Sequence, residues 1–569
     1  MKKLVRGLAL ILVLVMLVTC LGGCDLLFTL INMARSEGGS TVVIDPDPII
    51  IETIPTDPIP TDPDTDPFEL VFTLTDEDLQ RIDAMIDSCR DISYSTTAAR
   101  EEVEAAWDEL ELEMDYVSDQ TTIAQILYYM DTTDEAANQL YLDTYDDFLA
   151  LADKANLLQK DMYEDSPVKD WFFEDWTEAE IAYLLSYTSE QVEIQTELNE
   201  IQTQFVEMDD NALIVDYTDL YAQMVTLGNK QAQLSGYENY YEYMSATAYG
   251  RDYTAEQRET FRNYVKTIIM PVYGEIYNGV MDGASRLDYD GYVFFSDYMF
   301  SDYDSLATNY LRQYIDSTTG STYEYLNHMF TSGNYIMTDD ENAYEGAFTT
   351  RLDYYDCTLC YFGPGYQSTS TVAHELGHYY ASFFEDDSTP YDLLETHSQG
   401  NEALLLAHIG KDAPSGYEFV KDYEMFDTLL TMIIACMVDD YEQRIYEMES
   451  VEGLTTEQIT QIIDDVTNDY FGDYGGATYV EEFITDMQWY TRKVTGLNPA
   501  YYISYATSAV TSMNLFALAQ QDEEAARELY RKLVEEAPLV EGYEAALLSV
   551  GAASPFEESS FHTIVGLFK

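Results

Sequence analysis

The hydrophobic positions along most of the chain recur at the spacing of an α-helix. Thr75 and Asp78 form a capping-box pattern, and apolar residues then fall three and four positions apart over 79–86. The same spacing returns over 103–114. Further helices are predicted at 181–205, 255–270, 425–448 and 525–536. This pattern predicts a mainly α protein.

One segment departs from the helical pattern. Residues 348–362 read as strand, and they end in the turn sequence Gly363-Pro364-Gly365. We therefore expect a small antiparallel sheet beside this turn. Within the segment, Cys357 and Cys360 have the spacing of a redox or zinc pair, but residues three apart in a strand face opposite sides. We interpret the two cysteines as structural.

The first residues form a targeting segment. Three basic residues precede an apolar run over 8–18, which is too short to span a bilayer. The sequence Leu21-Gly22-Gly23-Cys24 follows and resembles the lipobox of bacterial lipoproteins. It implies a signal peptide at 1–23, removed when Cys24 is acylated, with an ordinary secretory signal as the alternative. We expect an extracytoplasmic protein that is lipid-anchored to the cell membrane.

The stretch from Cys24 to residue 67 differs in composition from the rest of the chain. Seven of the 15 prolines fall between residues 43 and 67, interleaved with Asp and Thr. Such a sequence has little to bury and favours an extended polyproline II conformation. Residues 24–67 are therefore predicted to form a stalk between the membrane and the folded part.

Charge narrows the range of partners. The 569 residues include 27 Lys and Arg against 105 Asp and Glu, a formal net charge of −78. This balance excludes a nucleic acid as partner, because binding one requires a basic surface. With 46% hydrophobic residues, the chain nevertheless has ample material for a core. The excess carboxylates indicate a solvated surface or electrostatic steering of cationic peptides, and the sequence does not separate the two.

The candidate chemistry follows the turn, in His374-Glu375-Leu376-Gly377-His378. On a helix, His374 and His378 project from one face and can hold a single Zn²⁺. Glu375 lies beside them, where a carboxylate can accept a proton from the attacking water. Since the chain has only six histidines, two of them are unlikely to meet this spacing by accident.

A catalytic zinc site needs a third protein ligand. Downstream, residues 391–406 have the pattern of a second helix that offers Glu395, His397 and Glu402. Glu395 and Glu402 are seven apart and share a face, so one can bind the metal while the other hydrogen-bonds a ligand imidazole. Spacing alone does not rank the three candidates.

The order of several motifs resembles the oligoendopeptidase F and thimet oligopeptidase family of zinc metallopeptidases. The similarity covers roughly residues 240–569. The motifs that carry it, in chain order, are Gly346-Ala347-Phe348, Gly363-Pro364-Gly365-Tyr366, Thr371-x-x-His374-Glu375-Leu376-Gly377-His378, Glu395-x-x-Ser398-x-x-Asn401-Glu402-Ala403 and the Tyr-rich segment Tyr501-Tyr502-Ile503-Ser504-Tyr505.

This resemblance implies particular roles. One Zn²⁺ per chain would be held by three ligands, which are His374, His378 and Glu395. Glu375 would be the general base and Glu402 a carboxylate that supports a ligand. Three phenols are candidates to stabilise the oxyanion of the reaction, namely Tyr501, Tyr502 and Tyr505.

The resemblance also implies fold and function. It implies a large helical body with a deep channel, divided into an N-terminal helical region at 68–200 and a catalytic region at 201–569. The activity implied is that of a zinc-dependent oligoendopeptidase, which hydrolyses internal bonds of short unstructured peptides at the outer face of the cell membrane. We further expect the strand before Gly363 to pair with an extended peptide, backbone to backbone.

Two other functions remain open. The family usually has a histidine where this chain has Ala381, and another within the region of 486–500, where this chain has none. These departures favour, as the alternative, a catalytically weak or inactive member that acts as a peptide-binding lipoprotein. A peptide-binding lipoprotein that serves a transporter would instead show alternating strands and helices, which are scarce here.

Overall fold

The computed structural model describes residues 70–174, 176, 181, 184–185, 188–207, 214–300, 306–385, 388–412, 414–448, 454–472, 495–496 and 498–569. The predicted signal peptide, Cys24 and the stalk lie outside these residues, so those interpretations stay predictions. None of the helices described is both long enough and apolar enough to cross a membrane.

The described chain is mainly α with one small sheet, as the sequence predicted. The α-helices are α3 (Asp76–Ser93), α4 (Arg100–Met130), α5 (Glu135–Asp165), α6 (Lys169–Phe172), α8 (Ser189–Glu207), α9 (Ile214–Leu234), α10 (Tyr240–Thr247), α11 (Ala255–Tyr264), α12 (Met270–Ala284), α13 (Tyr289–Phe300), α14 (Leu306–Ser317), α15 (Ser321–Ser332), α16 (Thr369–Ala381), α17 (Tyr391–Ile409), α18 (Tyr417–Tyr446), α19 (Thr456–Phe471), α21 (Ile503–Ala519), α22 (Glu523–Glu535), α23 (Tyr543–Val550) and α24 (Glu558–Gly566). A π-helical turn, η2 (Val265–Ile269), joins α11 to α12, and a 3₁₀ turn, η3 (Ala537–Leu539), follows α22. The strands are β1 (Tyr335–Met337), β2 (Ala347–Leu352) and β3 (Cys357–Phe362).

Local signals in the sequence locate several helix ends. Thr75 caps α3, and it forms the predicted capping box with Asp78. The helix predicted at 525–536 is α22, which begins two residues earlier behind the cap Asp522. The helix predicted at 255–270 is interrupted by η2, because its hydrogen bonding changes there from α to π.

The sheet is mixed, so the prediction of an antiparallel sheet was wrong in this respect. β2 and β3 form the expected antiparallel hairpin, but β1 pairs with β3 in parallel, in the order β1-β3-β2. The three residues of β1 are too few to show alternation in the sequence. The expectation that the strand before Gly363 pairs with a peptide was also wrong, because β3 already has a partner on each side.

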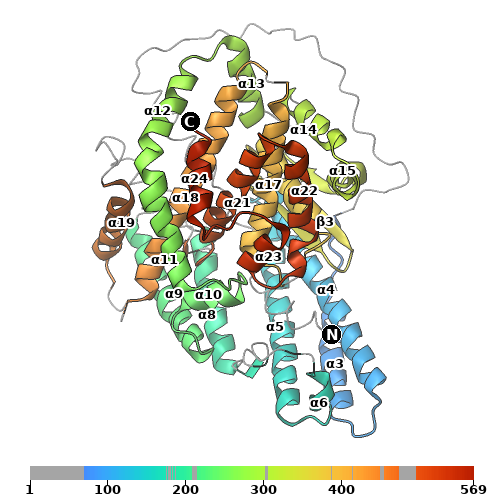
Figure 1. Cartoon of the computed structure of the whole chain (residues 1–569). Helices are drawn as coiled ribbons and strands as arrows, with labels where there is room; N and C mark the ends of the chain where they lie inside the picture. Colours follow the sequence, from blue (N-terminus) through green and yellow to red (C-terminus); the bar gives the residue numbers. More distant parts are fainter. Residues whose placement is uncertain are drawn as a thin grey trace.

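Two large hydrophobic clusters organise the helices. One cluster lies within α3 to α6 and the segment after them, and it includes Trp107, Phe148 and Phe172. In Figure 1 these helices extend away from the rest of the molecule. The larger cluster collects apolar side chains from α8 to α24. At its centre α17 packs against both α16 and α21 (Figure 1). The predicted division at residue 200 stays a prediction.

Helix α4 connects the N-terminal helices to the sheet. Its buried Asp119 accepts hydrogen bonds from the backbone N–H groups of Asp353 (3.1 Å) and Tyr355 (3.3 Å), in the turn between β2 and β3. The hydroxyl of Tyr361 in β3 donates to the backbone carbonyl of Tyr129 in α4 at 2.9 Å. Both contacts hold the hairpin that packs against the motif helix α16.

The buried Asp119 makes the stability pH-dependent. Burial raises the pKa of Asp119 from its ordinary value of about 4 to about 8, with the nearby Asp353 adding to the effect. The folded state therefore binds an extra proton between about pH 4 and pH 8, and this residue's contribution to stability falls as the pH rises through that window. We expect Asp119→Asn to gain about 1 to 2 kcal/mol over the wild type between about pH 5 and pH 8, measured by urea unfolding. If the difference in unfolding free energy between the variant and the wild type does not change with pH, this role of Asp119 is contradicted.

Candidate metal centre

Helix α16 positions the two histidines. It begins behind Ser368, whose hydroxyl accepts the N–H of Thr371 at 3.2 Å, and Val372 and Leu376 are buried on the side that packs into the core. His374 and His378 lie on the other side, one helical turn apart, with side chains 17% and 18% exposed. Both side chains are therefore largely buried and keep only a small exposed part.

Gly377 lets the second helix approach closely. A Cβ atom at this position would lie 2.6 Å from the Cα of Ser398 and 2.7 Å from the carbonyl oxygen of His397, both in α17. No side chain fits at such distances, so glycine is required between the two histidines. Asn401 of α17 also donates to the carbonyl of Ala373 in α16 at 2.7 Å. These contacts bring Glu395 opposite the histidine pair.

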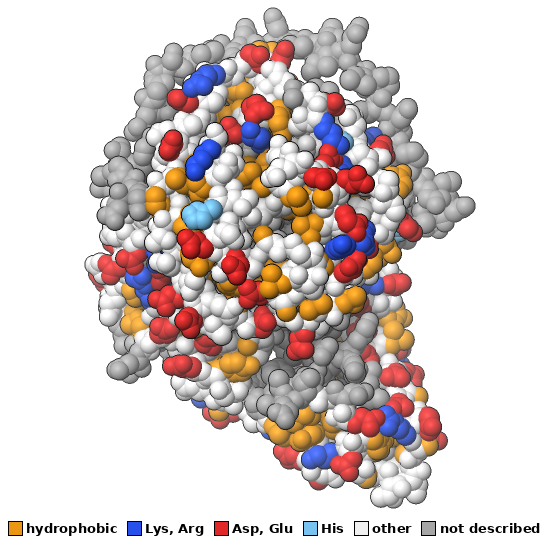
Figure 2. Space-filling model, in the orientation of Figure 1, with side chains coloured by type: hydrophobic (Ala, Val, Ile, Leu, Met, Phe, Trp, Pro, Cys, Tyr) orange, Lys and Arg blue, Asp and Glu red, His pale blue; other side chains and the backbone are white. Residues whose placement is uncertain are grey.

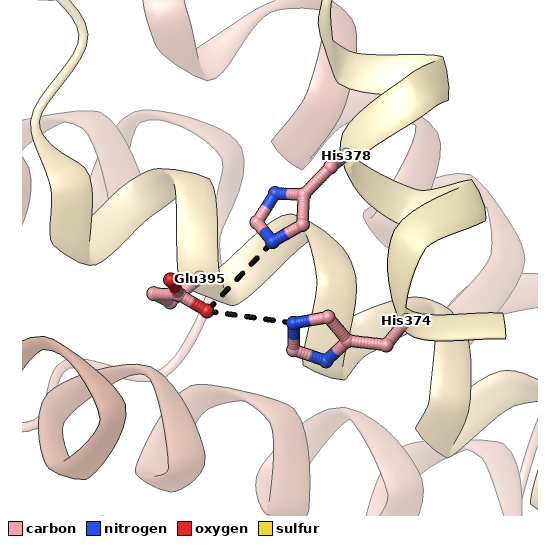
Figure 3. A group of neighbouring side chains, drawn as sticks. All are labelled: His374, His378 and Glu395. Carbon is pink, nitrogen blue, oxygen red and sulfur yellow. Dashed lines mark ion pairs between the residues drawn. The ribbon is translucent and has the colours of Figure 1, made fainter. Parts of the chain in front are cut away.

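Three side chains converge from the two helices (Figure 3). The Oε2 atom of Glu395 lies 3.7 Å from Nε2 of His374 and 3.8 Å from Nε2 of His378. One possible ligand atom from each residue lies within 4.8 Å of the others. Tetrahedral zinc with bonds of about 2.0 to 2.1 Å separates its ligand atoms by roughly 3.3 Å. The three residues thus fit a single metal ion with small shifts.

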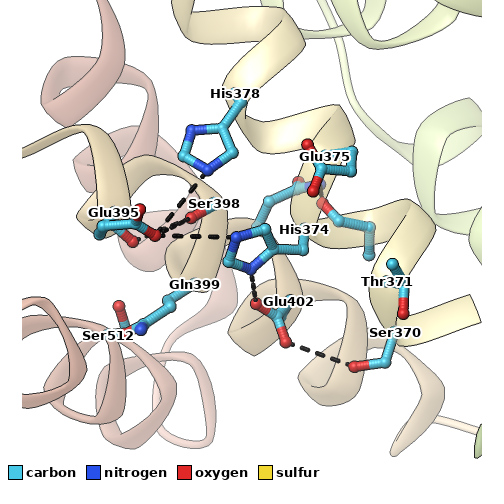
Figure 4. A network of polar contacts seen from close by, with 12 residues as sticks. Ser370, Thr371, His374, Glu375, His378, Glu395, Ser398, Gln399, Glu402 and Ser512 are labelled. Carbon is cyan, nitrogen blue, oxygen red and sulfur yellow. Dashed lines mark hydrogen bonds and ion pairs between the residues drawn. The ribbon is translucent and has the colours of Figure 1, made fainter. Parts of the chain in front are cut away.

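An unpaired ring nitrogen supports this fit. His374 Nε2 is buried and has no hydrogen-bond partner, although it faces Glu395. A buried polar atom without a partner is costly, and a metal ion would satisfy it. Its other nitrogen, Nδ1, lies 2.6 Å from Oε1 of Glu402 (Figure 4). That contact fixes the tautomer that presents Nε2 to a metal.

The two histidines differ in protonation. Burial, reinforced by the nearby His374, holds the pKa of His378 well below its ordinary value, so this ring is neutral and ready to bind a metal. Burial alone would lower the pKa of His374 too, but the carboxylate of Glu402 raises it to about 9. Metal binding at this site therefore displaces a proton from His374.

The structure separates the three candidates that spacing left unranked. Glu395 faces both histidines, whereas Glu402 lies behind His374 and also accepts a hydrogen bond from Ser370 at 3.3 Å. His397 is fully buried, and its Nε2 lies 3.0 Å from the carbonyl oxygen of Leu533. Its Nε2 is therefore engaged by the backbone of α22, and His397 is not in the group of residues that could hold a metal.

Glu402 should tune the metal affinity without binding the metal. In Glu402→Gln the amide oxygen can still accept the Nδ1 proton of His374, but the ring loses the negative charge that makes it a stronger ligand. We expect the dissociation constant for zinc, measured by competition with a chromophoric chelator, to rise by about 10- to 100-fold. Binding as tight as that of the wild type would contradict this role.

Glu375 occupies a separate position on α16. The residue is 1% exposed, and its Oε2 accepts a hydrogen bond from the hydroxyl of Thr349 in β2 at 2.7 Å. Burial raises the pKa of Glu375 to about 7, against the opposing effects of His374 and Thr349. A bound divalent cation would favour the ionised form. Sequence reasoning missed Thr349, whose only signal is its place in the strand that precedes the motif.

The three candidate tyrosines lie together at the start of α21. Tyr501 donates to Oε1 of Glu395 at 2.5 Å, and its oxygen lies 3.3 Å from that of Tyr505. The ring of Tyr502 packs against both. Tyr501 thus contacts a predicted metal ligand directly. The oxyanion role of Tyr501, Tyr502 and Tyr505 stays a prediction.

These features define a class of protein: a mainly α fold that carries a His-Glu-x-x-His helix and presents a glutamate from the next helix to both histidines. No family model matches the sequence, and no curated protein sequence matches it. Solved structures do match in fold, over most of the chain.

The structural neighbours are peptidases. A PZ peptidase A with an inhibitor superposes with a TM-score of 0.66 at 16% identity, covering 88% of this chain and 97% of the neighbour. A proposed oligoendopeptidase F from Bacillus anthracis gives 0.65 at 16% identity, with coverage of 88% and 96%. The oligoendopeptidase F from Enterococcus faecium gives 0.58 at 12%, with coverage of 87% and 96%. This chain therefore has the oligoendopeptidase F fold, in agreement with the order of its motifs.

Proposed function

We propose that the protein is a zinc-dependent oligoendopeptidase that hydrolyses internal bonds of short unstructured peptides. The observation that carries the proposal is the convergence of His374, His378 and Glu395 on one point, with Glu402 behind His374. The fold, shared with peptidase structures across almost their whole length, supports the same class of activity.

Zinc bound by His374, His378 and Glu395 would supply a Lewis acid that polarises the scissile carbonyl and acidifies water. Glu375 is the general base that takes a proton from the attacking water and delivers it to the leaving amine. Thr349 orients the carboxylate of Glu375 through its 2.7 Å hydrogen bond. Glu402 holds the tautomer of His374.

We assign peptide binding to β2, one of the two outer strands of the sheet. Within the described part of the chain, β2 is an edge strand with β3 on one side only. It packs against α16, and its Thr349 touches Glu375. An extended peptide that adds to β2 would gain backbone hydrogen bonds with little demand on sequence. Folded proteins would not present such a strand.

The location is proposed from the sequence. An acylated Cys24 would anchor the chain, and the stalk at 24–67 would hold the enzyme away from the lipid at the outer face of the membrane. Figure 2 shows acidic side chains scattered over the visible face and far fewer basic ones. This distribution suits a solvated surface that also attracts cationic peptides.

Peptide digestion tests the proposal. Purified protein would be stripped of metal with a chelator, dialysed, and incubated with unstructured peptides of about 5 to 20 residues, with and without added zinc. We expect internal cleavage only with zinc, identified by mass spectrometry, and no cleavage of a folded protein. If the zinc-loaded protein binds peptides without cutting them, the inactive peptide-binding alternative replaces this proposal.

A further inference from the structure

We propose that Arg251 is a positioning residue that sets the geometry of Glu395 and Tyr501 at the metal centre. The inference rests on the proposed function for its catalytic consequence. Arg251 follows α10 and is far from the motifs in sequence, yet its guanidinium bridges the two segments that carry these side chains.

The first contact of Arg251 is with the start of α17. Its Nε lies 3.0 Å from Oδ2 of Asp392, and the two side chains are 1% and 0% exposed. Asp392 precedes Glu395 by three residues, so both lie on neighbouring positions of one helical turn. Asp392 also accepts hydrogen bonds from Ser504 (3.0 Å) and Thr507 (2.5 Å) of α21. The arginine therefore fixes the turn that presents Glu395.

The second contact of Arg251 is with the turn before α21. Nη1 donates to the carbonyl of Ala500, and Nη2 donates to the carbonyl of Tyr501 at 2.9 Å and to Ser504 at 2.8 Å. Ala500 has φ +63°, a left-handed conformation that a non-glycine residue rarely adopts. Its N–H is held by the buried Glu442 at 2.8 Å. Two buried side chains, Arg251 and Glu442, thus hold the carbonyl and the N–H of a strained residue.

These contacts fix the position of the Tyr501 side chain. With its carbonyl held by Arg251, the tyrosine places its hydroxyl 2.5 Å from Oε1 of Glu395. Arg251 therefore positions both partners of this hydrogen bond. It positions the acceptor Glu395 through Asp392, and it positions the donor Tyr501 through the backbone carbonyl of that residue. A lysine could keep the charge but not the planar fork that reaches Asp392, Ala500 and Tyr501 together.

A pair of matched substitutions tests the role. Arg251→Lys is compared with Arg262→Lys, which alters another buried arginine, paired with Asp439 at 2.8 Å and not in contact with α17 or Tyr501. For Arg251→Lys we expect the dissociation constant for zinc to rise about 10-fold or more, with a lower kcat and a KM within about 3-fold of the wild type. For Arg262→Lys we expect lower thermal stability with unchanged zinc affinity and kcat.

The zinc measurement keeps this inference separate from the proposed activity. If the wild type binds zinc but cleaves no peptide, the proposed function fails, while a selective loss of zinc affinity in Arg251→Lys still supports the positioning role. Equal zinc affinity in Arg251→Lys, Arg262→Lys and the wild type would overturn it. If Arg251→Lys does not fold, Ser504→Ala, which removes one hydroxyl bridge to Asp392, takes its place. Unchanged zinc affinity in that variant would equally overturn the inference.

Discussion

Replacing Glu375 with glutamine is expected to lower kcat/KM for peptide cleavage by at least about 10²-fold, with zinc still bound. Glutamine has the shape of glutamate and can accept the Thr349 hydrogen bond, but it cannot take a proton from water. The carboxylate lies beside His374 and His378, the two proposed zinc ligands, without facing Glu395 (Figure 4). The loss should therefore fall on the reaction and leave zinc binding in place. Cleavage rates and bound zinc would be measured on the same preparation.

Asp119→Asn is the matched control for Glu375→Gln. It likewise replaces a buried carboxyl group with an amide, at a position whose hydrogen bonds go to the β2–β3 turn and not to the candidate metal centre. We expect this control to cleave peptides at the wild-type rate. A Glu375→Gln variant that keeps cleavage within a few fold of the wild type would exclude Glu375 as the base.

Replacing Glu395 with glutamine is expected to weaken zinc binding on the order of 10³-fold, and to abolish cleavage at zinc concentrations that saturate the wild type. Glutamine retains the size of the side chain and can still accept the hydrogen bond from Tyr501, so the helix packing should persist. It lacks the negative charge that lies 3.7 and 3.8 Å from the two imidazole nitrogens. The loss of zinc affinity should exceed that in Glu402→Gln, because Glu402 contacts His374 at Nδ1, the ring nitrogen that does not face Glu395.

A neighbouring glutamate provides the control for this second prediction. Glu385 lies 4.0 Å from Nδ1 of His397 and outside the group that converges on the metal position. Glu385→Gln should therefore bind zinc as the wild type does. If Glu395→Gln binds zinc normally, the third ligand has been assigned to the wrong residue.

The sequence predicts the helical part of the site well because its signals are local. The His374–His378 pair needs only one turn of helix, and Gly377 lies within the same motif. The side chain that faces the two histidines was harder to predict, because Glu395, His397 and Glu402 belong to one helix. Only the crossing of that helix with α16 decides which of the three lies opposite the histidines. That crossing depends on the contact of Gly377 with α17, which no spacing rule contains.

Contacts between distant segments could not be predicted in this way. Arg251 reaches Asp392 and Tyr501 across 141 and 250 residues of chain. Thr349 meets Glu375 only because the β2–β3 hairpin packs against α16. The wrong expectation for the strand before Gly363 has the same origin, since the short β1 that covers its other edge gives no alternation signal.

A zinc titration tests the central claim most directly. Zinc would be added stepwise to metal-free protein, with bound metal and the rate of peptide cleavage measured at every step. The account predicts that cleavage rises in proportion to bound zinc and reaches its plateau at about one equivalent per chain. Cleavage by the metal-free protein, or one bound zinc without cleavage, would contradict it.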